Sequence, residues 1–199
     1  LVMLLIGLAS AAAIQLSTLN NATEDIADNW LPSVRTVNEM KSQILRVRLT
    51  LTTHALTTDD AAMAVIDKEL VTERDALNQL RTRYEALISG DEERKLYNQF
   101  VEERRNVLAI DDRVLSHSRK NENDQARALM DGESEKLFEQ SIDTLDNLVK
   151  VNSEGANASR TAAAKTYSEA QATLLVVAVL AITLAIVAAV WLVRSITKP

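Results

Sequence analysis

One arginine stands where a heptad pattern otherwise predicts buried apolar residues. Val37, Ile44, Leu51 and Ala55 belong to one stripe of alternating three- and four-residue spacings, and Arg48 occupies the same stripe. A cation in such a stripe needs a partner, because an unpaired buried charge is strongly unfavourable. The partner could be an acidic residue of a neighbouring helix, water at a dimer interface, or the carboxylate of a bound ligand.

If a ligand carboxylate is the partner, polar residues around Arg48 should complete the site. Thr52 and Thr53 follow it on the same helix. When heights are measured from the two predicted membrane boundaries, Arg48 lies opposite residue 142 of the last helix, close to Gln140 and Thr144. The predicted ligand site therefore contains Arg48 as anchor and these four residues as hydrogen-bonding neighbours. Ordinary surface polarity is the alternative explanation for the polar residues on the last helix.

The remaining reactive residue types do not form a catalytic or metal-binding pattern. His54 and His117 fall near the same end of the predicted domain, but neither has a histidine or carboxylate at ligand spacing on its helix. The sequence has no Cys, no HExxH motif, no phosphate-binding loop and no nucleophile with an evident base. We therefore predict that the chain is not an enzyme and that it binds no cofactor or metal.

Charged residues of both signs alternate along residues 92–113, which predicts a solvated helix face. This face would contain Glu92, Glu93, Arg94, Lys95, Glu102, Glu103, Arg104, Arg105, Asp111, Asp112 and Arg113. The formal net charge of the chain is −6, which argues against nucleic acid as a partner because phosphate binding needs a basic surface.

Two apolar segments at the ends of the chain predict membrane spans. Residues 173–193 carry no charge and are about 20 residues long, enough to cross a bilayer as a helix. Residues 1–16 are also apolar, and we interpret them as the C-terminal part of a first span, with a cleaved signal peptide as the alternative. All 28 acidic residues lie between the two segments, whereas Arg194 and Lys198 follow the second one, which places the C-terminus in the cytoplasm.

The segment between the spans predicts an all-α fold, an up-down-up-down antiparallel four-helix bundle flanked by two transmembrane helices. Only 4 Gly and 2 Pro occur in the chain, and polar or glycine-containing breaks near residues 57–60, 89–91 and 120–124 divide four long amphipathic segments. Pro32 should kink the first helix or mark a restart after Trp30. The predicted domains are the first span to residue 16, the sensor bundle 17–172, the second span 173–193, and a linker from 194 to 199.

Two spans around a four-helix bundle, followed by Arg194-Ser195-Ile196-Thr197-Lys198-Pro199, resemble a bacterial methyl-accepting chemotaxis receptor. The last six residues resemble the start of a HAMP linker. Within the first helix, Arg48-Leu49-Thr50-Leu51 and Ala55 are similar to the stretch in which aspartate receptors supply three arginines to their ligand. Thr53 and Thr57 occupy the positions of the other two arginines, so a ligand with one carboxylate fits better than aspartate.

This resemblance implies a chemoreceptor in the bacterial inner membrane with a periplasmic sensor domain. It implies a homodimer paired through its first helix, a small anionic ligand at that interface, and a signal passed by a small displacement of the last helix to a cytoplasmic module. Lys41 and Arg48 on the seam of the first helix favour the same pairing, because neither fits inside a closed single-chain core. The alternatives are the sensor region of a histidine kinase or diguanylate cyclase, or an ectodomain that recognises a periplasmic protein.

Overall fold

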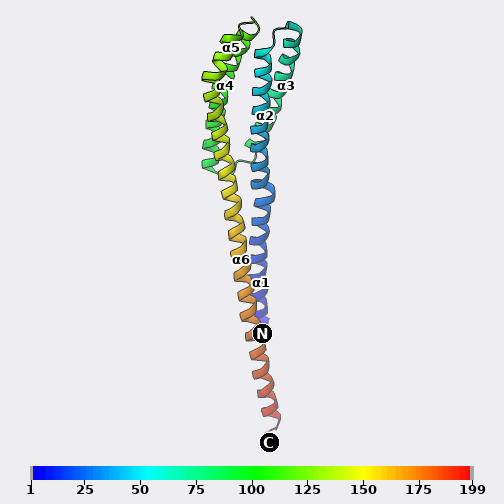
Figure 1. The fold of residues 1–199 in the computed structure, drawn as a ribbon. Helices are drawn as coiled ribbons and strands as arrows, with labels where there is room; N and C mark the ends of the chain where they lie inside the picture. Colours follow the sequence, from blue (N-terminus) through cyan, green and yellow to red (C-terminus); the bar gives the residue numbers. More distant parts are fainter. Residues whose placement is uncertain (1, 198–199) are drawn as a thin grey trace. The chain divides into compact units, whose positions relative to one another are not determined.

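The computed structural model describes residues 2–197, and helices account for nearly all of them (Figure 1). No strand occurs among these residues, which confirms the predicted all-α fold. The elements in chain order are α1 (Val2–Glu24), the π-helical η1 (Asp25–Trp30), α2 (Leu31–Leu56), α3 (Asp60–Glu85), α4 (Asp91–Ser118), α5 (Asn123–Leu129), the π-helical η2 (Met130–Ser134) and α6 (Glu135–Thr197).

The helices belong to two compact units, which we describe separately. One unit contains residues 27–156, and the other contains the first 26 residues together with those from Asn157 onward. In the first unit α2, α3, α4 and the beginning of α6 form the four-helix bundle (Figure 1). The exact domain boundaries deduced from the sequence stay predictions.

The three breaks between the bundle helices lie where the sequence predicts them. Asp59 caps α3 by accepting a hydrogen bond from the backbone N–H of Ala62 at 2.8 Å. Gly90 precedes α4, whose first turn contains three acidic residues that favourably oppose the helix dipole. Asn121 adopts a left-handed backbone conformation (φ 57°) in the turn before α5, where a short polar side chain is tolerated.

Pro32 lies in the first turn of α2, directly after the π-helical turn η1. The backbone of Trp30 is still helical (φ −64°, ψ −47°), so the chain passes from η1 into α2 without the predicted restart, and the irregular π-helical turn precedes the proline that lacks an N–H group. The indole ring of Trp30 packs against Gly155 of α6, and a Cβ added to Gly155 would lie 2.6 Å from the ring. Only glycine therefore permits this close contact.

The core of the bundle contains two apolar clusters. The first includes Val37, Met40, Ile44, Leu77, Tyr84, Tyr97, Phe100, Leu145 and Leu148. The second includes Val47, Leu51, Ala55, Leu70, Ile110, Val114, Leu115, Ala126 and Met130. Along α3 and α4, Arg74 and Arg104 come between members of the two clusters. The core is therefore interrupted by charged residues.

The second unit contains α1 and the C-terminal part of α6. These helices together line a cavity that includes Leu16 and Leu19 of α1 and Tyr167, Ala170 and Leu174 of α6. Within the described residues, one helix, α6, is long and apolar enough to cross a membrane. The large apolar residues of α6 from Leu174 to Ile196 are exposed, as a lipid-facing surface requires. The first span stays a prediction, and residue 1 lies outside the described residues.

Candidate ligand-binding site

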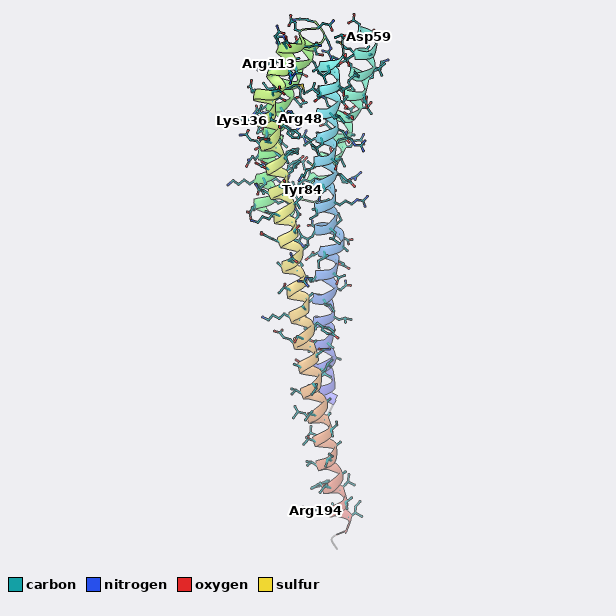
Figure 2. All side chains as sticks on the ribbon, in the orientation of Figure 1. Arg48, Asp59, Tyr84, Arg113, Lys136 and Arg194 are labelled. Atoms are coloured by element: carbon teal, nitrogen blue, oxygen red, sulfur yellow. The ribbon has the colours of Figure 1, made fainter. Side chains whose placement is uncertain are left out.

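Arg48 belongs to α2, and its side chain contacts the end of η2 and the first turn of α6 (Figure 2). Its guanidinium group forms an ion pair with Glu135 and donates hydrogen bonds to the Ser134 hydroxyl at 3.2 Å and the Met130 carbonyl at 3.3 Å. The Phe138 ring stacks below the group, with its centroid 4.6 Å from Cζ. Of the partners considered for this cation, an acidic residue of a neighbouring helix is the one found in the single chain.

The two threonines predicted to flank Arg48 bind the backbone of their own helix. The Thr52 hydroxyl donates to the Arg48 carbonyl at 2.8 Å, and the Thr53 hydroxyl donates to the Leu49 carbonyl at 2.9 Å. Thr52 is partly buried, whereas Thr53 is exposed. Each hydroxyl oxygen still has lone pairs that can accept a hydrogen bond from a ligand.

The two predicted residues of α6 do not meet Arg48. Gln140 is exposed, and the buried Thr144 faces α4, where its hydroxyl donates to Glu103 at 3.0 Å and accepts from Gln99 at 3.2 Å. The ion pair fixes Arg48 near Glu135, and Thr144 lies nine residues further along α6, roughly 13 Å at the rise of an α-helix. The separation is too great for one small ligand to reach both side chains in this chain.

Three charged residues of the predicted solvated face of α4 are buried instead. Glu93, Arg104 and Asp111 are each less than 5% exposed. The stripe through Phe100, Val107 and Val114 has three- and four-residue spacings, and its extension passes through all three. This periodicity was the signal that could have located them, because position on the stripe predicts burial whatever the residue type.

The buried carboxylate of Glu93 has neutral partners. It accepts a hydrogen bond from the Tyr84 hydroxyl at 2.7 Å and another from the backbone N–H of Ser89 at 3.0 Å. Asn152 of α6 donates to the Tyr84 oxygen at 3.0 Å, so three helices meet in one polar cluster. Burial, together with Glu93, raises the pKa of Tyr84 and keeps the phenol protonated.

The buried charges Arg104 and Asp111 lie next to Arg74 of α3. Burial lowers the pKa of Arg104 and raises the pKa of Asp111, although each of the two charges opposes the shift of the other. The closest approach of Arg74 to Asp111 is 3.8 Å, from Nη2 to Oδ2. Arg74 also donates to Asp112 at 3.3 Å.

His54 is completely buried at the end of α2. Its Nδ1 lies 2.8 Å from the Ser118 hydroxyl, and its Nε2 lies 3.4 Å from a carboxylate oxygen of Asp67. Burial lowers the pKa of His54, and Arg119 lowers it further, against the opposing effect of Asp67. Within the described part of the chain, no three His, Asp or Glu side chains are grouped as metal ligands.

A bundle of long helices with one helix continuing into an apolar segment is the architecture of a membrane-bound sensor module. A family model described as a four-helix-bundle sensory module for signal transduction matches residues 1–167, and the chain belongs to this family. The chain is also similar to the "Putative sensory transducer protein YvaQ" of Bacillus subtilis (strain 168), with 27% identity over 135 residues. The match covers 68% of this chain but only 24% of that protein.

Proposed function

We propose that the chain is the sensing and membrane-spanning part of a bacterial inner-membrane chemoreceptor, with its sensor bundle in the periplasm and two spans. One observation supports this proposal above the others. α6 runs as one uninterrupted helix from Glu135, inside the sensor bundle, through the apolar residues 173–193 to Thr197. A helix transmits displacement along its axis because its backbone hydrogen bonds keep its length fixed. A displacement of α6 caused by ligand binding would reach a cytoplasmic signalling module by this route, and the module would direct chemotaxis.

The proposed ligand is a small organic acid whose carboxylate binds Arg48. The Glu135 carboxylate that now pairs with Arg48 is nearly half exposed, with 44% of its side chain accessible. Ion pairs that solvent reaches contribute only about 0–1 kcal/mol, so a ligand carboxylate can replace Glu135 at small cost. The Thr52 and Thr53 hydroxyls donate to the backbone of α2, so they can accept hydrogen bonds from a hydroxyl or amine group of the ligand. Gln140 and Thr144 are not part of this proposed contact, because Gln140 is exposed and the buried Thr144 pairs with α4.

The proposed receptor is a homodimer that pairs through α2. Leu45, Leu49 and Leu56 are each more than half exposed and recur at helical spacing on α2. Covering such a stripe with the same stripe of a second copy removes apolar surface from water. Lys41 and Arg48 do not support this pairing, because they pair with Asp146 and Glu135 of their own chain.

A ligand screen on the full chain in detergent or nanodiscs tests the proposed function. Monocarboxylates, dicarboxylates and amino acids are screened by thermal shift, and the best ligand is then titrated calorimetrically. We expect Arg48→Ala to weaken binding by about ten- to a hundred-fold, because it removes a charge-assisted hydrogen bond worth about 1.5–3 kcal/mol. Arg46→Ala is the matched control, since Arg46 lies on the same helix and is exposed.

Two results would contradict the Arg48 site. Equal affinity of the parent and Arg48→Ala would place the ligand elsewhere, and equal loss in both arginine variants would indicate a general charge effect. Glu135→Gln provides a second variant that leaves Arg48 in place. Because Glu135 competes with the ligand, we expect this variant to bind the acid more tightly than the parent.

A further inference from the structure

A cavity of about 210 Å³ lies between α3 and α4, on helices that the proposed ligand site does not use. Arg74 and Arg81 of α3 and Arg104 of α4 line it, together with Asp112 and the short polar side chain of Asn78. Three guanidinium groups from two helices therefore converge on one small space. Burial lowers the pKa of Arg104, and the neighbouring charges of Arg74 and Arg81 lower it further against the opposing effect of Asp111.

The guanidinium groups of this cavity have donors that the chain does not satisfy. Among the residues that the structure describes, four of their buried nitrogens lack a hydrogen-bond partner, namely Nε and Nη2 of Arg74, Nε of Arg81 and Nε of Arg104. A donor that is removed from water and left unpaired is unfavourable, and buried groups of this kind normally have a partner. Arg104 is only 4% exposed, so bulk solvent does not readily supply one.

The carboxylates near the cavity do not balance its positive charge. Arg74 makes the contacts with both of them, at 3.3 Å to Asp112 and 3.8 Å to Asp111. Arg81 donates to the Asn78 amide oxygen at 3.2 Å, and this acceptor is neutral. Among the described residues, the three cations that line the cavity thus face two carboxylates, and one positive charge is left over. An anion with several oxygens would satisfy both the charge and the unpaired donors.

We propose that the α3–α4 cavity is a second binding site of this chain and that it takes a small anion with several oxygens, either a tetrahedral anion or a dicarboxylate. Guanidinium groups bind such anions through parallel N–H···O hydrogen bonds, for which their planar geometry is suited. The site lies within one chain. Its occupancy therefore requires neither the dimer nor Arg48.

Titration of the full chain in detergent or nanodiscs tests this site. Inorganic phosphate, sulfate and succinate are added separately, with potassium chloride at matched ionic strength as the blank, and binding is followed by calorimetry and by the melting temperature. We expect saturable binding of at least one of the three anions. Binding of phosphate and sulfate without succinate identifies a tetrahedral anion, and binding of succinate alone identifies a dicarboxylate.

Paired variants locate the bound anion. Arg81→Gln and Arg104→Gln each remove a cation of the cavity, and we expect about ten-fold weaker binding or more. Arg83→Gln and Arg105→Gln make the same charge change at side chains that are 61% and 71% exposed, and they should bind as the parent does. Asp112→Asn removes a competing carboxylate and should bind the anion more tightly. If Arg104→Gln does not fold, the anion affinities of Arg81→Gln and Arg83→Gln alone decide whether the anion binds in the cavity.

Two outcomes would overturn the proposal. In the first, none of the three anions stabilises the chain more than chloride does. In the second, Arg81→Gln binds the anion as tightly as the parent does, and a loss of binding in Arg48→Ala would then assign the anion to the α2 surface. Retained binding in Arg48→Ala supports the cavity, even if no organic acid binds at Arg48.

Discussion

Two charged contacts within the same bundle differ in how their ions are paired. Between α2 and α6, Lys41 pairs with Asp146 and Arg48 with Glu135, and about half of each carboxylate side chain is exposed. Between α3 and α4, Arg74, Arg81 and Arg104 line one cavity, Arg74 contacts both Asp111 and Asp112, and the Asp111 side chain is only 4% exposed. The charges of the first contact are balanced and their carboxylates reach solvent, whereas the second contact includes the buried Arg104 and Asp111 and has an excess of positive charge.

The difference indicates which contact can exchange partners and which is fixed. Charges that water can reach lose little free energy when they separate, so the α2–α6 pairs can open for a ligand. Buried charges have no such alternative, so the α3–α4 group must remain paired within the protein or with a bound anion. The following variants test this difference.

We expect the largest effect from Asp111→Asn, which leaves Arg104 and Arg74 without their buried carboxylate. Breaking a buried pair typically lowers the free energy of unfolding by about 3–5 kcal/mol. Asp112→Asn is the matched control, because the neighbouring side chain is 68% exposed and should contribute about 0–1 kcal/mol. Chemical unfolding of the full chain measures both. Equal losses would contradict the claim that the buried carboxylate of Asp111 stabilises the bundle more than an exposed one does.

Tyr84→Phe should produce the next largest effect, because the Tyr84 hydroxyl is a neutral donor to the buried Glu93 carboxylate. The change removes the hydroxyl donor from Glu93 and the acceptor from Asn152, and we expect a loss of about 1–3 kcal/mol. Tyr97→Phe is the control, since its hydroxyl makes a longer hydrogen bond, 3.4 Å to the Arg81 carbonyl. A larger loss in the Tyr97 variant would contradict the assignment of Glu93 to Tyr84.

Glu135→Gln should have a small effect on stability, about 0–1 kcal/mol. Arg48 keeps its hydrogen bonds to Ser134 and the Met130 carbonyl and its contact with Phe138, so the lost ion pair is only part of its surroundings. Unfolding at low and high salt measures the remaining difference, which should shrink as salt rises. A loss as large as that of Asp111→Asn would show that Arg48 cannot exchange its partner.

The pH dependence contributed by His54 should be a shallow slope in mildly acidic solution. Burial lowers the pKa of His54 below its ordinary value of 6.5, so the unfolded chain binds the proton more readily than the folded one. The stability contribution of His54 is therefore complete above pH 6.5, and it is lost as pH falls toward the folded-state pKa. His54→Gln should flatten the free energy of unfolding between pH 7 and 5, measured against His117→Gln. An unchanged slope in His54→Gln would assign the dependence to other groups.

The helices and their ends could be predicted because local chemistry determines them. Asp59 as an N-cap and Gly90 before an acidic first turn each act within one turn of their position. The buried charges of α4 could not be predicted by composition, because Glu93, Arg104 and Asp111 occupy core positions of a stripe whose other members are apolar. There, position within the heptad overrides the usual preference of charges for water.

The candidate site could be predicted only in part. The position of Arg48 on the seam indicated that it needs a partner, and the structure provides Glu135. Its predicted neighbours on α6 depended on matching heights across the bundle, and height alone does not tell which way a side chain points around its helix. Thr144 lies on the side of α6 that packs against α4, and it is buried there.

Signal transmission along α6 is tested most directly by measuring whether α6 moves when ligand binds. The chain has no cysteine, so single spin labels can be introduced by Arg160→Cys on α6 or Arg46→Cys on α2, both at exposed positions. Distances between the labels of two copies are then measured by electron paramagnetic resonance in nanodiscs, with and without the organic acid that gives the largest thermal shift.

Saturating ligand should change the α6 distance by about 1–2 Å, the usual size of helix shifts at subunit interfaces, while the α2 distance stays constant. A ligand can produce this change only by binding one position of α6 more tightly than the other. Identical α6 distances with and without a ligand that binds would contradict transmission along this helix.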